Sequence, residues 1–272
     1  MYQVDVHHGI AETTDGVRIA YQVSGEGPAL VLCHAMANDH SMFDPHRDVF
    51  SAANTLITFD QRGSGDSDHP PFKEGPDGQY TVEAFGSDLK AVLDKLGIER
   101  ASVLGFSMGA VAALWFSTTH PQRVERLILA SAMASRLPQP IIDRARLVEE
   151  MLDTKGIEET YDFYFAGALF DGVLANTEVR GQLARARSKA TEHGFKGCFR
   201  VTIDRPSLVD RLGGIVSPAL ILVGENDTHY LAEAELLERS ISIAKRVVMP
   251  GVGHPMACLL YTSDAADDSA LV

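Results

Sequence analysis

A serine stands between two glycines in the stretch Gly105-Phe106-Ser107-Met108-Gly109. An apolar run typical of a strand precedes this stretch, and a run of small and apolar residues typical of a helix follows it. Glycines at these spacings let strand and helix approach each other, and the tight turn holds Ser107 in a strained backbone at the N-terminal end of the helix. The pattern therefore predicts an exposed serine nucleophile.

A serine hydroxyl is a poor nucleophile near neutral pH, so it needs a base, and the base needs an acid to orient it. Asp227 follows the apolar run 219–224, and His254 follows the apolar run 246–249. Proteins with this nucleophile turn carry the acid before the histidine, and open parallel sheets form their sites at the carboxyl ends of strands. We expect Ser107, Asp227 and His254 to form a catalytic triad. His229 is the substitute base and Glu225 the substitute acid.

Acyl transfer also needs hydrogen-bond donors for the oxyanion that forms on the substrate. The backbone amide of Met108, directly after the serine, is expected to supply one donor. The loop after the first buried strand, "CHAMANDHSMF", is expected to supply the second from the amide of Met36. His34, at the start of the same loop, is expected to shape the substrate site.

The first half of the chain alternates short apolar runs with helical patterns. Residues 9–23 predict a hairpin with its turn at Asp15-Gly16. An alternation of buried strands and amphipathic helices indicates right-handed crossovers and a mostly parallel sheet. The expected strands are 28–35, 54–63, 101–107, 124–132, 217–224 and 244–249, and the expected helices are 81–97 and 108–121.

Helical patterns replace this alternation between residues 135 and 207. Aromatic residues concentrate there, and we expect Tyr161, Tyr164 and Phe165 to contact the substrate. The sequence therefore predicts an α/β core made of residues 1–134 and 208–257, interrupted by a helical cap at 135–207.

Composition excludes several kinds of partner. The net charge of −13 argues against nucleic acid and against an anionic membrane surface. The three cysteines show no metal-site spacing, so we expect neither a metal nor a cofactor and place the chain in the reducing cytoplasm. We see no signal peptide and no membrane-spanning run. The expected partner is a small-molecule ester or lactone, and the oligomeric state is left open.

The stretches "LCHAM", "FDQRGSGDSD", "GFSMGA", "GEND" and "GVGH" resemble the α/β-hydrolase superfamily, over about residues 8–256. The chain departs from the family at Ala35, where a glycine is usual. The resemblance implies a mostly parallel central sheet with helices on both faces and a small helical cap. It also implies that Asp60 and Arg62 fix loops.

Within that superfamily, "HAMANDHSMFDP", residues 80–110 and the short cap are similar to 3-oxoadipate enol-lactonases. This likeness implies cofactor-independent cleavage of a small ester or lactone through an acyl-enzyme. Carbon–carbon bond hydrolysis and perhydrolysis use the same triad and stay open. A ligand-sensing receptor with little turnover also stays open. Serine at position 107, in place of aspartate, argues against haloalkane dehalogenases and epoxide hydrolases.

Residues 258–268 read "CLLYTSDAADD" and match the translation of a transposase adapter used in sequencing libraries. We therefore expect residues 258–272 to be a non-native tail on a chain assembled from environmental (metagenomic) DNA.

Overall fold

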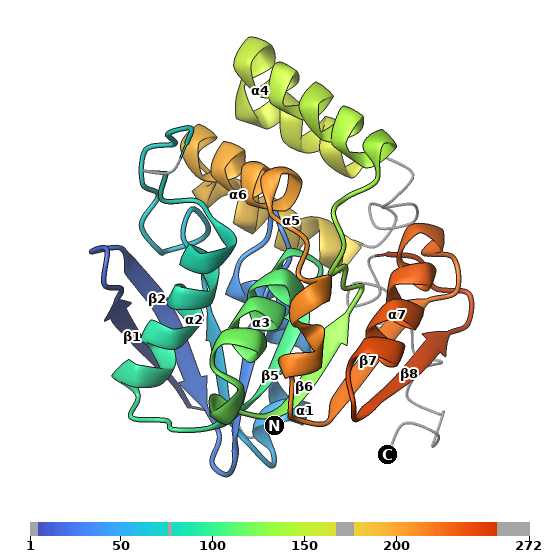
Figure 1. Ribbon diagram of the computed structural model, residues 1–272. Coiled ribbons are helices and arrows are strands. Elements are labelled where there is room, and N and C mark those ends of the chain that lie inside the picture. The colour runs from blue at the N-terminus through green and yellow to red at the C-terminus, as the bar shows by residue number, and fades with distance from the viewer. Residues whose placement is uncertain (1–4, 76–77, 167–176, 255–272) are drawn as a thin grey trace.

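The computed structural model describes residues 5–75, 78–166 and 177–254, so the segment 258–272 lies outside the described residues. Figure 1 shows a central twisted sheet with helices packed along it and a further group of helices over one end. The sheet has eight strands in the order β1-β2-β4-β3-β5-β6-β7-β8. Their bounds are β1 Val6–Glu12, β2 Arg18–Ser24, β3 Ala29–Cys33, β4 Thr55–Phe59, β5 Ala101–Phe106, β6 Val124–Ala130, β7 Ala219–Gly224 and β8 Ala244–Met249.

The sheet is parallel except around β2. Strands β1 and β2 form the expected antiparallel hairpin, and β2 also pairs antiparallel with β4. Gly16 takes φ +79° in the hairpin turn, a conformation that favours glycine. From β4 to β8 every pairing is parallel. The carboxyl ends of these strands therefore meet at one edge, where the loops that follow them can form a site.

The helices that cover the sheet follow from apolar stripes. Thr81 caps α2 by accepting a hydrogen bond from the Ala84 amide at 3.1 Å, and Gly97 ends it with φ +67°. Helix α3 is buried along nearly its whole length and packs on β3, β5 and β6. Helix α7 packs on β7 and β8. The bounds are α1 Arg47–Ser51, α2 Val82–Lys95, α3 Met108–Thr119 and α7 Thr228–Ser240.

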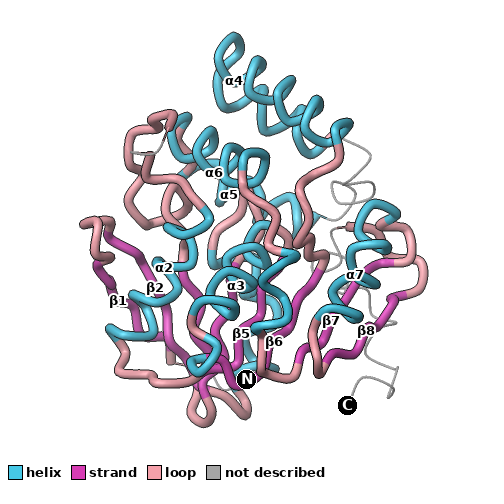
Figure 2. Tube along the Cα trace, in the orientation of Figure 1, coloured by secondary structure: helices cyan, strands magenta, loops and turns pink. Residues whose placement is uncertain are grey.

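Among the residues that the structure describes, three α-helices lie between β6 and β7: α4 Gln139–Phe165, α5 Thr177–Lys189 and α6 Glu192–Asp204. Figure 2 shows them above the carboxyl ends of the strands. Gly156 has a non-helical backbone (φ 77°, ψ 179°) that breaks α4 into two pieces. Helix α6 begins separately from α5, because Thr191 caps α6 by accepting a hydrogen bond from the Gly194 amide.

These helices share a hydrophobic cluster of their own, separate from the cluster around the sheet. The cap cluster reaches the core at Met36 and Ala37, in the loop after β3. In the described part of the chain, no helix is both long enough and apolar enough to cross a membrane.

Candidate active site

Ser107 lies in the turn between β5 and α3 with φ +53° and ψ −111°, a conformation that non-glycine residues seldom adopt. Its amide donates to the Ala130 carbonyl at 2.9 Å, which fixes the turn to β6. A Cβ on Gly105 would lie 2.5 Å from the Ala110 Cα, and one on Gly109 would lie 2.1 Å from the Cys33 carbonyl oxygen. Both glycines are therefore needed for the close approach that presents the serine.

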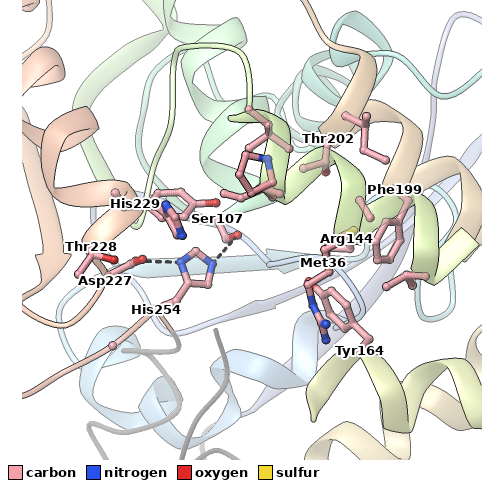
Figure 3. Close-up of a pocket in the computed structure, with 18 of the residues that line it drawn as sticks. Met36, Ser107, Arg144, Tyr164, Phe199, Thr202, Asp227, Thr228, His229 and His254 are labelled. Atoms are coloured by element: carbon pink, nitrogen blue, oxygen red, sulfur yellow. Dashed lines mark hydrogen bonds and ion pairs between the residues drawn. The ribbon is translucent and has the colours of Figure 1, made fainter. Parts of the chain in front are cut away.

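Ser107, His254 and Asp227 form a continuous chain of hydrogen bonds, shown by dashed lines in Figure 3. The Ser107 Oγ lies 3.0 Å from His254 Nε2, and His254 Nδ1 lies 2.8 Å from Asp227 Oδ2. Asp227 precedes the first turn of α7, and His254 follows β8. Because Asp227 can only accept, Nδ1 carries the proton and Nε2 is free to accept one from Ser107.

The two substitute residues occupy other positions. His229 lines the same cavity as Ser107, but the Ser107 hydroxyl donates its hydrogen bond to His254. Glu225 accepts a hydrogen bond from the Gly251 amide at 2.9 Å, so it supports the loop that carries His254.

Tyr230 closes one side of this arrangement from the first turn of α7. Its ring centroid lies 4.5 Å from that of His254, and it lines the cavity. Burial and the nearby Asp227 carboxylate raise the pKa of Tyr230. Its hydroxyl is therefore neutral over the ordinary pH range.

The two residues expected to donate to an oxyanion come from the start of α3 and from the loop after β3. Met108 is the first residue of α3, so its amide is among the four that have no partner within the helix. Met36 lines the cavity together with Ser107, and the following Ala37 takes φ +58°.

The cavity above Ser107 has a volume of about 730 Å³, which is the size of pockets that bind small molecules. One face of α4 supplies much of its lining, with a spacing that repeats over the helical turn. Among the described residues that line the cavity, Arg144 is the one arginine, and none is a lysine. Figure 3 shows Arg144 beside Met36 and Tyr164. The residues of this face are Pro140, Ile141, Arg144, Ala145 and Val148, and Tyr164 joins the lining from the other piece of α4.

His34 does not line this cavity. It is fully buried, its Nδ1 donates to the Ala35 carbonyl at 2.8 Å, and its Nε2 accepts from the Gln61 amide at 3.0 Å. Burial lowers the pKa of His34, so the ring is neutral. Both nitrogens are occupied, and the residue joins the loop after β3 to the loop after β4 instead of contacting substrate.

Of the three aromatic residues expected to contact substrate, the structure places Tyr164 in the cavity lining. Tyr161 and Phe165 lie one helical turn apart, on a face of α4 that packs inside the cap, with ring centroids 5.8 Å apart. The Tyr161 hydroxyl donates to the Ala37 carbonyl at 3.0 Å. Tyr161 and Phe165 therefore lie outside the lining of this cavity, and Tyr161 attaches the cap to the loop that carries Met36.

Sequence reasoning missed several lining residues, among them Ile141, Arg144, Phe199 and Tyr230. The helical spacing of the α4 residues could be recognised in the sequence. Spacing alone does not determine whether a helix face packs against another helix or lines a cavity. The position of Tyr230, three residues after the expected acid, was a usable signal.

Two charged groups hold the loops beneath the site, as the resemblance implied for Asp60 and Arg62. Arg62 is fully buried and its guanidinium contacts Asp88 at 2.7 Å. Asp60 accepts from the His40 amide at 2.7 Å, from His40 Nδ1 at 2.8 Å and from the Asp66 amide at 2.8 Å. Each of these carboxylates joins segments that are distant in the sequence.

One group of side chains within the described residues could approach a metal ion, namely Asp39, His40 and Asp60. His40 and Asp60 already bond to each other, and Asp39 Oδ1 accepts from the amide and hydroxyl of Ser41. Burial opposes a charge on His40, but the hydrogen bond and charge of Asp60 raise the pKa of His40 overall, so its proton offsets part of the negative charge of this group.

Comparison with known proteins shows which proteins share this fold. A family model described as the alpha/beta hydrolase fold matches residues 28–162. 3-Oxoadipate enol-lactonase 1 from Acinetobacter baylyi is 24% identical over 241 residues, covering 87% of this chain and 86% of that protein. The crystal structure of a hydrolase from Pseudomonas aeruginosa superposes with a TM-score of 0.79 at 29% identity, covering 93% of this chain and 97% of that one.

A Bacillus subtilis protein with the provisional name 2-succinyl-6-hydroxy-2,4-cyclohexadiene-1-carboxylate synthase is 26% identical over 254 residues, covering 89% of each chain. These relatives, the family model and the strand order together define the class: the chain has the α/β-hydrolase fold, and the proteins it resembles are hydrolases of that fold. Among its relatives, those that match along most of its length include an enol-lactonase and a solved hydrolase.

Proposed function

We propose that this chain is a serine hydrolase that cleaves a small carboxylic ester or lactone through an acyl-enzyme. The observation that carries the proposal is the hydrogen-bonded series from Ser107 through His254 to Asp227, which opens into a cavity of small-molecule size. The enol-lactonase and hydrolase relatives support the same reaction class.

The proposed mechanism uses only groups of this chain. Ser107 Oγ attacks the substrate carbonyl carbon while its proton passes to His254 Nε2, and Asp227 stabilises the imidazolium that forms. The amides of Met36 and Met108 donate to the oxyanion. Collapse of the intermediate breaks the ester bond, and His254 returns the proton to the leaving oxygen. Water then repeats the sequence on the acyl-enzyme and releases the acid.

The cavity lining favours a short, mostly apolar substrate. Ile141, Val148 and Phe199 contribute apolar side chains, and Arg144 adds a cation among them. A small ring or short acyl group suits this lining, and Arg144 suits a carboxylate elsewhere on the molecule. We expect a higher kcat/KM for short esters and lactones than for long-chain esters.

Replacing the nucleophile tests the proposal. Ser107→Ala should lower kcat on an activated short ester by about four orders of magnitude or more, because triad members act as a unit. Ser117→Ala is the matched control, since Ser117 is a fully buried serine on the same helix that bonds only to a backbone carbonyl. A Ser107→Ala protein that keeps more than a few per cent of the wild-type rate would contradict the assignment.

A second candidate is hydrolysis of a carbon–carbon bond, which the same series of Ser107, His254 and Asp227 could carry out. Accumulation of an acyl-enzyme on an activated ester distinguishes the ester or lactone hydrolase from the carbon–carbon bond hydrolase. A burst of product equal to the enzyme concentration on an activated ester, followed by steady turnover, supports the ester hydrolase. A single slow turnover would instead favour a ligand-sensing receptor, and turnover confined to carbon–carbon substrates would favour the second candidate.

A further inference from the structure

Ser131 follows β6 directly and belongs to no motif that the sequence suggested. It is fully buried, and its backbone takes φ +45°, in the left-handed region that favours glycine. Its amide donates to the Leu222 carbonyl at 2.9 Å, so its backbone is attached to β7. A buried non-glycine residue in this conformation stores strain, and such residues cluster at functional sites.

The Ser131 hydroxyl lies between the acid and the base of the proposed triad. Its Oγ is 3.1 Å from Asp227 Oδ2 and 3.2 Å from the backbone carbonyl oxygen of His254. Both of these atoms accept, so the hydroxyl is the donor to each. The hydroxyl has one hydrogen, which the two acceptors share. A hydrogen bond to an ionised carboxylate is stronger than one to a neutral carbonyl, so the interaction with Asp227 is the stronger of the two.

The surroundings of Asp227 make this donor important. The carboxylate is 2% exposed, and its Oδ1 has no hydrogen-bond partner among the described residues. Oδ2 accepts from both His254 Nδ1 and the Ser131 hydroxyl. A buried carboxylate with few donors is costly, so each of its two donors has a large effect on its charge and orientation.

We propose that Ser131 is a positioning residue for the triad, which orients the Asp227 carboxylate, holds the loop of His254 and moderates the pull of Asp227 on the imidazole proton. The inference rests on the proposed function of Ser107, Asp227 and His254. The alternative is that Ser131 merely ends a strand. Glycine would fill that structural role without strain, and it would lack the hydroxyl that makes both contacts.

Two substitutions separate the effect of the Ser131 hydroxyl from the effect of its strained backbone. Ser131→Ala removes the hydroxyl and keeps the strained φ, whereas Ser131→Gly removes the hydroxyl and relieves the strain. We expect both to lower kcat/KM on a short ester about tenfold, mostly through kcat, because a charge-assisted hydrogen bond is lost. We expect the melting temperature of Ser131→Gly to lie above that of Ser131→Ala.

The pH profile supplies a readout that a purely structural role would leave unchanged. Without the Ser131 donor, the carboxylate charge falls more fully on His254, which favours the imidazolium. The acidic limb of the kcat/KM profile should therefore move to higher pH in both variants, because His254 stays protonated up to a higher pH. Ser117→Ala, another buried serine variant, should leave the limb in place.

A readout independent of turnover distinguishes failure of this inference from failure of the proposed function. The proton on His254 Nδ1 should give a downfield NMR resonance that disappears in His254→Asn and shifts in Ser131→Gly. If wild-type protein hydrolyses no ester but this shift occurs, the proposed function fails and the positioning role stands. Wild-type rates, an unmoved acidic limb or an unshifted resonance in both Ser131 variants would overturn the inference.

Discussion

At the scale of single residues, the hydrogens at the nucleophile can be accounted for one by one. Because Asp227 fixes the proton of His254 on Nδ1, the Ser107 hydroxyl donates to Nε2. A hydroxyl that contacts Ser107 from another side must then be a donor. Tyr230 lines the same cavity with its ring against His254 and can supply such a donor, because its raised pKa keeps its proton in place.

We expect Tyr230→Phe to lower kcat about tenfold, which is the effect of losing one hydrogen bond of ordinary strength at the reacting oxygen. The phenyl ring preserves the contact with His254, so melting temperature should change little. The loss should be larger for esters with poor leaving groups, which need more help to depart. Tyr164→Phe, in the same cavity, is the control. Equal losses for good and poor leaving groups would argue that the Tyr230 hydroxyl only fills space.

Residue types and spacing were sufficient to predict the members of the hydrogen-bonded series but not the substrate contacts. Ser107, Asp227 and His254 each follow a strand signal, and parallel strands bring such positions to one edge. His34 also follows a strand, yet the chain folds its ring inward, where the Gln61 amide bonds to it. That outcome depends on the neighbouring loop, which periodicity does not describe.

At the scale of secondary structure, the core strands were predictable because each is a short apolar run between turn residues. The cap was harder, because α4 carries apolar residues around several faces. One face, with Tyr161 and Phe165, packs inside the cap, and another, with Ile141 and Val148, lines the cavity. Only the packing of α4 against α6 and against the loop after β3 decides between the two.

The cavity face of α4 makes substrate charge a testable property. Arg144 lies 4.9 Å from the Phe163 ring and donates one hydrogen bond to the Phe163 carbonyl, which leaves further donors of its guanidinium for a ligand. Arg144→Gln should lower kcat/KM for a carboxylate-bearing short ester about tenfold more than for a neutral ester of equal length. Arg146→Gln is the control, since Arg146 lies on the same exposed helix outside the cavity lining. Equal losses on both esters would assign Arg144 to packing alone.

The contact between His40 and Asp60 makes the stability of the loop after β3 depend on pH. Burial opposes protonation of His40, but the hydrogen bond and charge of Asp60 raise its pKa overall. Burial of Asp60 is likewise outweighed by His40, which lowers the pKa of Asp60. The pair thus stabilises the fold most between the unfolded pKa values of about 4 and 6.5.

As pH rises through the raised pKa of His40, the contribution of its charge is lost, and as pH falls through the lowered pKa of Asp60, that of the carboxylate is lost. The difference in melting temperature between wild type and His40→Gln should therefore shrink as pH rises from about 6.5 into the alkaline range. His69→Gln serves as the control. A difference that stays constant over this range would mean that His40 is neutral in the folded protein.

At the scale of the whole molecule, two hydrophobic clusters serve different purposes. The cluster around the sheet includes α2, α3 and α7 and holds the strands whose ends carry the site. The cap cluster is smaller and built from α4, α5 and α6. Since the cavity lies between core and cap, the cap can open locally without loss of the sheet.

Substitutions in the two clusters should therefore differ in kind. Leu114→Ala, in the fully buried part of α3, should lower the free energy of unfolding by about 2–5 kcal/mol and leave kcat/KM per folded molecule unchanged on a short ester. Phe199→Ala, in the cap cluster and the cavity lining, should speed amide exchange in α4, α5 and α6 and raise KM for small substrates. Exchange in β3 and β5 should stay at the wild-type rate in Phe199→Ala. If amide exchange in β3 and β5 instead accelerates as much as exchange in α4, α5 and α6, the cap and the core unfold as one unit. Removal of a cap side chain would then weaken the whole fold.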